Sequence, residues 1–119
     1  MKTMLMATLL IFPVATALAQ DHPPSSGPLG IKPVTGNEFV QVVRISLPPH
    51  AKTPMHDVTP RVVVWLRDAH FVDRYADGTT REETRKAGDA EWVSARRHSG
   101  ENLSDQPMEF IAVVIKAAH

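Results

Sequence analysis

The sequence predicts an all-β protein, a small antiparallel β-barrel or jelly roll, and three observations lead to that fold class. Short runs of β-branched and aromatic residues recur along the chain, separated by residues that favour turns. No run beyond residue 20 has the apolar stripe of an amphipathic helix. An Asp-Gly dipeptide at residues 77–78 lies between two extended runs, which is a strong hairpin signal. We therefore expect about six to eight short strands.

Composition narrows the possible functions. The 119 residues include 13 Lys and Arg, 13 Asp and Glu, and no cysteine. Balanced charge disfavours binding to nucleic acid, because no basic field is present to attract it. Without cysteine the chain has no disulfide, no catalytic thiol and no zinc-thiolate site.

The first twenty residues resemble a secretory signal peptide. Lys2 supplies a positive start, residues 4–18 are almost wholly apolar, and Ala17-Leu18-Ala19 is a small-residue cleavage pattern. The apolar run is shorter than a membrane span needs, and Pro13 interrupts it. We expect cleavage near Ala19 or Gln20, a periplasmic or secreted protein, and no stable membrane span afterwards.

Residues 21–37 are predicted to form an arm or linker, and residues 38–119 a single barrel domain. The stretch from Asp21 to Pro33 is rich in proline, glycine and serine. Proline fixes φ and removes backbone donors, so an extended conformation is expected rather than a helix. The arm either lies along a partner subunit or forms a leader between signal peptide and domain.

Two apolar runs predict core strands early in the domain. Residues 38–47 are β-branched, and Pro48-Pro49 ends the run. The apolar pattern changes parity between Val42 and Val43, which predicts a bulge or a strand buried on both faces there. Residues 61–66 are apolar without alternation, which is typical of a central strand covered on both faces.

The later elements follow from turn chemistry. Residues 70–75 and 79–86 are predicted to pair as a hairpin, and the second arm, polar on both faces, is expected at a solvated edge. Further strands are predicted at 91–93 and 108–116. Turns are expected at two polar stretches, Ser99-Gly100-Glu101-Asn102 and Ser104-Asp105-Gln106-Pro107.

Two stretches carry the candidate chemistry, since each pairs a histidine with a β-type run. The first contains Pro54-Met55-His56, and the second contains Gly88-Asp89, Trp92, His98 and Asn102. In this order they resemble the motifs of the cupin superfamily, in particular small single-domain secreted cupins. The resemblance covers about residues 40–116 and implies a cupin β-barrel. It also implies a homodimer, because small cupins commonly pair.

The first motif is degenerate. His50 stands where the motif has glycine, Val58 where it has a second histidine, and Val62 or Val63 where it has glutamate. In the second motif Ser94 and Arg96 replace the usual proline and glycine. Residue by residue, the resemblance carries over only His56 and His98 as metal ligands.

A divalent transition metal, Fe, Mn, Ni or Zn, would therefore have two histidines where three or four ligands are usual. Asp57 points away from His56 in a regular strand and does not supply a third. The alternative is that both histidines line the barrel mouth without metal. No catalytic residue is assigned.

The candidate ligand-binding residues are His50, Trp65, Trp92, Arg96 and Asn102. Arg96-Arg97 beside His98 would favour a carboxylate or another anion, because guanidinium forms paired hydrogen bonds with such groups. The tryptophans are candidates for a pocket floor or for the core.

Three functions remain open from the sequence. The protein binds a small polar or anionic ligand, with or without a weakly held metal. Alternatively it is a metal-dependent enzyme resembling cupin dioxygenases, isomerases or lyases, which would use His56 and His98. As a third alternative it is a non-catalytic dimeric interaction module.

Overall fold

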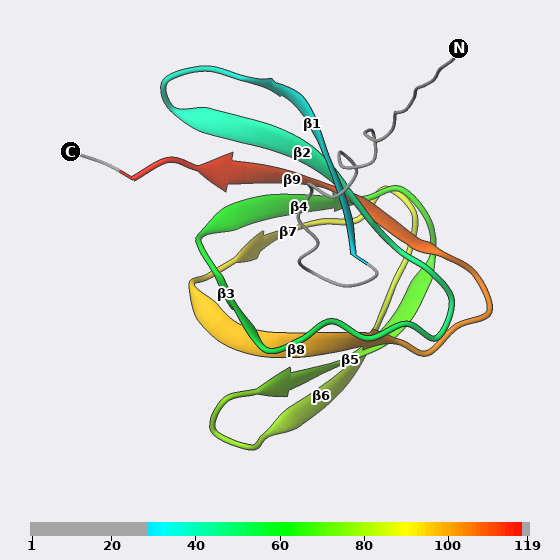
Figure 1. Ribbon diagram of the computed structural model, residues 1–119. Helices are drawn as coiled ribbons and strands as arrows, with labels where there is room; N and C mark the ends of the chain where they lie inside the picture. Colours follow the sequence, from blue (N-terminus) through cyan, green and yellow to red (C-terminus); the bar gives the residue numbers. More distant parts are fainter. Residues whose placement is uncertain (1–28, 118–119) are drawn as a thin grey trace, which may run out of the picture.

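The computed structural model describes residues 29–117, which form two facing β-sheets (Figure 1). The strands are β1 (Gly30–Gly36), β2 (Val40–Leu47), β3 (His56–Val58), β4 (Arg61–Trp65), β5 (Ala69–Tyr75), β6 (Thr80–Arg85), β7 (Ala90–Val93), β8 (Arg96–Asn102) and β9 (Met108–Ile115). One sheet has the order β1-β2-β9-β4-β7 and the other β3-β8-β5-β6, and every pairing is antiparallel. The predicted all-β barrel is confirmed. Residues 29–117 contain no helix of the length and apolarity needed to cross a membrane.

The first core strand, β2, lies inside the five-stranded sheet. It pairs with β9 without interruption from Val40 to Leu47, so the bulge predicted at Val42 and Val43 is not in this strand. The register shifts instead in β1, between Pro33 and Thr35, directly opposite those two valines. The change in the apolar pattern of β2 therefore predicted where along the strand pair the irregularity lies. It did not predict that the extra residue is in β1.

Strand β1 contains part of the predicted arm. Residues 30–33 are extended, as expected, but they pair with β2 at the edge of the sheet. The preceding residues of the arm, 21–28, and the predicted signal peptide lie outside the described residues.

Strand β4 is interior, between β9 and β7, as the apolar run predicted. Its two faces differ, however. Val63 and Trp65 are buried against the other sheet, whereas Val62 and Val64 on the outer face are only half-buried. The prediction that this strand is covered on both faces was therefore wrong for the single chain. None of residues 29–117 forms a layer over the outer face of β4.

The predicted hairpin is confirmed in β5 and β6. Its turn uses Gly78 at φ +95°, a conformation that glycine adopts without strain, and β6 forms the edge of the four-stranded sheet. The turn predicted at residues 99–102 was wrong, since β8 runs through Asn102 and pairs with β5 up to Phe71. The residues of this stretch are of types that favour turns, but pairing with β5 holds them in a strand. The bends predicted after it are present at residues 104–106.

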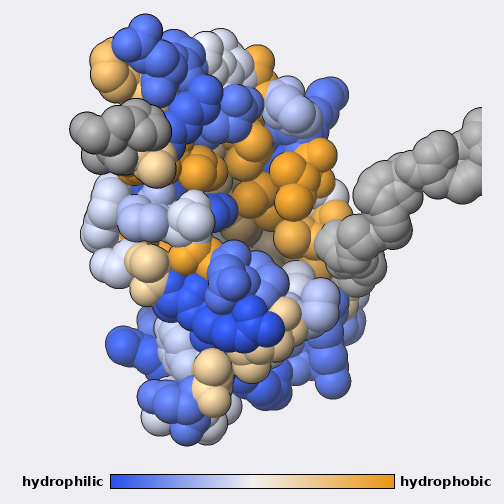
Figure 2. All heavy atoms as spheres, turned by 60° about the vertical axis from the view of Figure 1, so that its left-hand side comes forward, coloured by the Kyte–Doolittle hydropathy of each residue, from blue (hydrophilic) through white to orange (hydrophobic). Residues whose placement is uncertain are grey.

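Packing between the sheets forms one apolar core. Its buried members are Leu47, Val58, Val63, Trp65, Ala69, Phe71, Val93 and Met108. Figure 2 shows one face of the molecule, on which apolar side chains gather in the middle, with hydrophilic residues above and below them. The core does not fill the whole space between the sheets, and a cavity remains.

Candidate functional site

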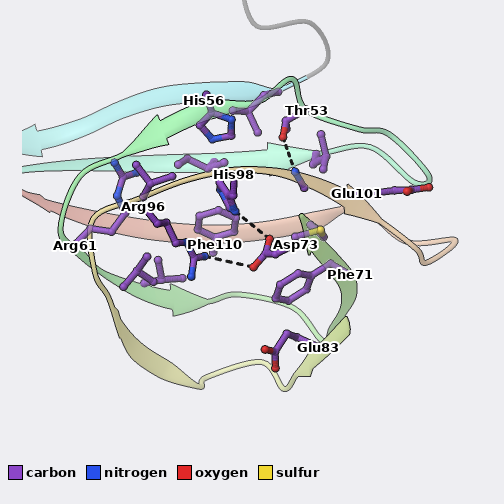
Figure 3. A pocket seen from close by; sticks show the side chains of 18 of the residues that line it. Thr53, His56, Arg61, Phe71, Asp73, Glu83, Arg96, His98, Glu101 and Phe110 are labelled. Atoms are coloured by element: carbon purple, nitrogen blue, oxygen red, sulfur yellow. Dashed lines mark hydrogen bonds and ion pairs between the residues drawn. The ribbon is translucent and has the colours of Figure 1, made fainter. Parts of the chain in front are cut away.

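The cavity has a volume of about 450 Å³ and is lined by inward side chains of both sheets. Aromatic rings form one wall. Trp65 stacks on Phe71 with ring centroids 5.2 Å apart and meets Phe110 at 4.8 Å. Figure 3 shows the charged side chains that face this cavity. A compartment of this kind accommodates a small molecule with an apolar body.

Strand alternation places the two motif histidines in the cavity. His56 and His98 are directly paired across β3 and β8, and their ring centroids lie 4.9 Å apart. His56 Nδ1 lies 2.7 Å from Pro54 O, so this nitrogen donates and Nε2 is left for other contacts. The next pair along these two strands, Asp57 and Arg97, points outward and forms an exposed ion pair at 3.0 Å. The predicted direction of Asp57, away from His56, is confirmed.

A buried carboxylate connects His98 to a guanidinium. Asp73 is 5% exposed; its Oδ1 lies 3.2 Å from His98 Nδ1 and its Oδ2 lies 3.4 Å from Arg96 Nη2. Arg96 also donates through Nη1 to the Tyr75 hydroxyl, at 3.3 Å. The His98–Asp73 contact has the distance of an ion pair but not the angle of a hydrogen bond. His98 Nδ1 and Arg96 Nε are therefore buried without a hydrogen-bond partner in the described part of the chain.

Arg61 faces this group from the opposite sheet. Its Nε and Nη2 donate to the backbone oxygen and the hydroxyl of Thr59, and no carboxylate among residues 29–117 lies within ion-pair distance of it. Burial, and to a smaller extent the charge of Arg96, lower the pKa of Arg61. An arginine remains protonated at neutral pH even so. Arg61 and Arg96 thus place two guanidinium groups at one end of the cavity beside His98, and one carboxylate, Asp73, is shared by Arg96 and His98 (Figure 3). We call Arg61, Arg96 and His98 the unpaired corner, because Arg61 has no carboxylate partner among residues 29–117 and two nitrogens, Arg96 Nε and His98 Nδ1, have no hydrogen-bond partner there.

The other end of the cavity is fully paired. Arg85 binds both carboxylate oxygens of Glu91, with Nε at 2.6 Å from Oε2 and Nη2 at 2.9 Å from Oε1. Trp65 Nε1 donates to the same carboxylate at 2.7 Å, and Glu83 accepts from Arg85 at 3.2 Å. The hydrogen bonds from Arg85 lower the pKa of Glu91, and in return they raise the pKa of Arg85. At this paired end, Arg85 with Glu83 and Glu91, four of the five N–H groups of Arg85 already donate hydrogen bonds within the protein.

The structure brings four of the seven sequence-predicted site residues together. His56, His98, Trp65 and Arg96 all line the cavity. Asn102 does not, although the motif placed it near His98. Its side chain is fully buried, and its amide donates to the carbonyl oxygens of Leu47, Pro48 and Gln106. It therefore holds the loops at the end of the barrel.

His50 and Trp92 also lie outside the cavity. His50 occupies a turn with φ 60° and bonds to Asp105 at 2.6 Å, in an exposed position. Trp92 is 57% exposed and lies beside Val62 on the outer face of the five-stranded sheet. Alternation explains its direction, because its neighbours Glu91 and Val93 point into the cavity.

Sequence reasoning missed Arg61 and Asp73. For Arg61 a signal was present: Arg61, Val63 and Trp65 have the same parity, so the strand that directs Trp65 inward also directs Arg61 inward. Asp73 shares parity with Phe71 on β5 in the same way.

The donor set does not fit the transition metal that the motifs implied. Within residues 29–117 no group of three or more His, Cys, Asp or Glu side chains could hold a metal ion. His56 and His98 supply two imidazoles, and Asp73, the carboxylate beside His98, already contacts His98 and Arg96. Three or four ligands are usual for such an ion.

Comparisons with known proteins agree on the architecture. No family model matches the chain, and no curated protein sequence matches it. Among solved structures it is similar to a cupin domain from Bordetella pertussis Tohama I, with TM-score 0.69 and 22% identity over 80% of this chain and 100% of that one. This chain has the cupin fold.

Two further structures show how widely this fold is distributed. The polyketide cyclase RemF from Streptomyces resistomycificus aligns with TM-score 0.62 and 15% identity, over 89% of this chain and 80% of that one. An RmlC-like cupin with a double-stranded β-helix from Methanocaldococcus jannaschii aligns with TM-score 0.57 and 16% identity, over 93% and 92%. At these identities the likeness concerns the cupin fold, and the function has to be argued from the site.

Proposed function

We propose that this cupin-fold protein binds a small molecule with a carboxylate head and an apolar body inside its barrel, without a resident metal. The observation that carries the proposal is the unpaired corner. There Arg61 has no carboxylate partner among the described residues, Arg96 Nε is a buried donor without an acceptor, and His98 Nδ1 is a buried nitrogen whose contact with Asp73 lacks hydrogen-bond geometry.

Unpaired buried donors are costly, since each loses its hydrogen bonds to water, at about 1–3 kcal/mol per group. Burial is the main cause of the lowered pKa of Arg61, and repulsion by the facing Arg96 guanidinium lowers it further. An anion between them would relieve both costs at once. A carboxylate is well matched, because guanidinium donates two parallel N–H groups to its oxygens.

The rest of the cavity favours an apolar body on that ligand. Trp65, Phe71 and Phe110 supply an aromatic wall, and the Arg85–Glu91 pair is closed to a second charged group. A volume of about 450 Å³ lies within the range of small-molecule sites. The best ligand therefore carries one charged end only.

Two probes of equal size test the charge requirement, 3-phenylpropionate and its neutral analogue 3-phenylpropanamide. Binding is followed by calorimetry and by the fluorescence of Trp65 in a Trp92→Phe background, since Trp65 lines the cavity and Trp92 does not. The carboxylate should bind about 10- to 100-fold more tightly than the amide, the ratio expected for a charge-assisted hydrogen bond of about 1.5–3 kcal/mol.

Arg61→Gln should abolish that preference. Arg44→Gln is the matched control, because Arg44 is an exposed arginine of the same sheet that pairs with Glu109 outside the cavity. Equal affinity for acid and amide in the wild-type protein would refute the proposal. So would an Arg61→Gln variant that retained the full preference.

A further inference from the structure

The cavity wall holds a hydrogen-bond donor and an acceptor that a bound carboxylate would not use, at a place where the lining has no side chain. Thr53 and Asp73 are buried, at 9% and 5% exposed, and Gly100 of β8 lies beside both. All three line the cavity, and Figure 3 labels Thr53 and Asp73. We propose that this polar niche, Thr53, Asp73 and Gly100, binds a hydroxyl group of the ligand, which is then a hydroxy acid. This inference rests on the carboxylate site proposed above.

Thr53 is held in place by two reciprocal hydrogen bonds with Gly100. Its backbone N–H donates to Gly100 O at 2.8 Å, and its Oγ1 accepts from the Gly100 N–H at 2.8 Å. The hydroxyl group also carries one hydrogen of its own. Residues 29–117 supply no acceptor for that hydrogen. Thr53 therefore offers the cavity a donor whose oxygen is already fixed by a buried hydrogen bond.

Asp73 supplies the acceptor. Its Oδ2 accepts from Arg96 Nη2 at 3.4 Å, whereas its Oδ1 contacts His98 Nδ1 at 3.2 Å without hydrogen-bond geometry. A carboxylate oxygen has lone pairs for two hydrogen bonds, so Oδ1 keeps an acceptor position whichever way the imidazole turns. Because Arg96 already balances the charge of Asp73 and Arg61 lies nearby, a neutral donor suits this oxygen better than an ammonium group.

Gly100 leaves room for a ligand group between the donor and the acceptor. A Cβ atom at this position would lie 3.7 Å from Asp73 Oδ1 and 3.8 Å from Thr53 Oγ1, which is ordinary van der Waals contact. A group that occupies this space is therefore close to both oxygens at once. A hydroxyl group matches the pair, because its oxygen accepts one hydrogen bond and its hydrogen donates another.

Asp73 also joins the niche to the unpaired corner, since one of its oxygens contacts Arg96 and the other faces the space at Gly100. A hydroxyl group in the niche then belongs on the carbon next to the carboxylate of the ligand. The ligand class is accordingly a 2-hydroxy acid with an apolar body. The donor, the acceptor and the carboxylate site have fixed relative positions, so one configuration at that carbon fits and its mirror image does not.

3-Phenyllactate tests this assignment, because it differs from 3-phenylpropionate only by a hydroxyl group on carbon 2. Calorimetry measures the affinity of each enantiomer for the wild-type protein. One enantiomer should bind about 10- to 100-fold more tightly than 3-phenylpropionate, the range for a hydrogen bond to a charged group. The other should bind within about threefold of 3-phenylpropionate. Phenylalanine, which has an ammonium group in place of the hydroxyl, should bind more weakly than the favoured enantiomer.

Two substitutions should remove the preference in different ways. Gly100 does not have a positive φ, so Gly100→Ala fills the niche without backbone strain and should reduce the affinity of the favoured enantiomer to that of 3-phenylpropionate. Thr53→Val removes the donor and should act alike, whereas Thr53→Ser keeps the hydroxyl and should retain most of the preference. Thr80→Val is the matched control, because Thr80 is an exposed threonine of β6 that does not line the cavity.

Thr53→Val also leaves the Gly100 N–H without its acceptor, so Gly100→Ala decides the question if that variant fails to fold. If 3-phenylpropionate binds but neither enantiomer of 3-phenyllactate binds more tightly, the niche is wrong and the carboxylate site stands. The same conclusion follows if both enantiomers gain equally, if phenylalanine binds most tightly, or if Gly100→Ala keeps the preference. If none of these acids binds to the folded wild-type protein, the proposed function fails, and the niche fails with it.

Discussion

Two arginines, Arg85 and Arg61, face the opposite sheet across the cavity, and they differ in the charge of the residue that they face. At the paired end, Arg85 of β6 meets Glu91 of β7 and holds both of its oxygens. At the unpaired corner, Arg61 of β4 faces Arg96 of β8, and burial, together with a smaller effect of the Arg96 charge, lowers the pKa of Arg61. The first contact stabilises the barrel by attraction between the sheets. At the unpaired corner the positive charges of Arg61 and Arg96 face each other, as is common in binding sites where a ligand supplies the opposite charge.

The largest effect on stability is expected at the paired end. Arg85→Met would leave Glu91 and Glu83 without their shared cation, although both carboxylates are at least two-thirds buried. Breaking a largely buried charged network typically costs about 2–4 kcal/mol. Urea unfolding should show this loss, whereas the control Arg44→Met, which breaks an exposed pair, should change the free energy of unfolding by less than about 1 kcal/mol. Equal losses in the two variants would contradict the comparison.

A smaller effect on stability should appear with pH. The Arg85 hydrogen bonds lower the pKa of Glu91 below its ordinary 4.5, so the folded state binds the proton less readily than the unfolded chain. The stabilisation is complete above the ordinary pKa and is lost as pH falls through the lowered value. Unfolding free energies measured from pH 6 down to pH 3 should therefore fall less steeply in Glu91→Gln than in wild type. Parallel curves would show that Glu91 titrates normally.

Most of the fold could be predicted from local chemistry, because strands and turns leave signals within a few residues. The Asp77-Gly78 turn and the strand at 61–66 are examples. The error at residues 99–102 has a physical cause. Its serine, glycine and asparagine favour turns in isolation, but here they are held in a strand by pairing with β5, and that partner is remote in sequence.

The site was harder to predict than the fold. His56 and His98 were found because they stand in a spaced motif, and Arg96 because it adjoins one of them. The Arg85–Glu91 contact joins strands of different sheets, and no periodicity within one strand indicates which remote strand will face it. Motif resemblance also misplaced Asn102, since spacing along the chain says nothing of whether a side chain points into the cavity or into a loop.

The smallest expected effect on stability tests the unpaired corner itself. Arg61→Met removes a half-buried charge that faces Arg96 and has no carboxylate partner in residues 29–117. Its hydrogen bonds to Thr59 are exposed, so water can replace them. Replacing such a charge with an apolar side chain is often neutral or stabilising, and we expect the free energy of unfolding to stay constant or rise by about 1 kcal/mol. Urea unfolding without ligand measures this change directly. A loss comparable to that of Arg85→Met would mean that Arg61 supports the barrel, and the distinction between the two ends of the cavity would then fail.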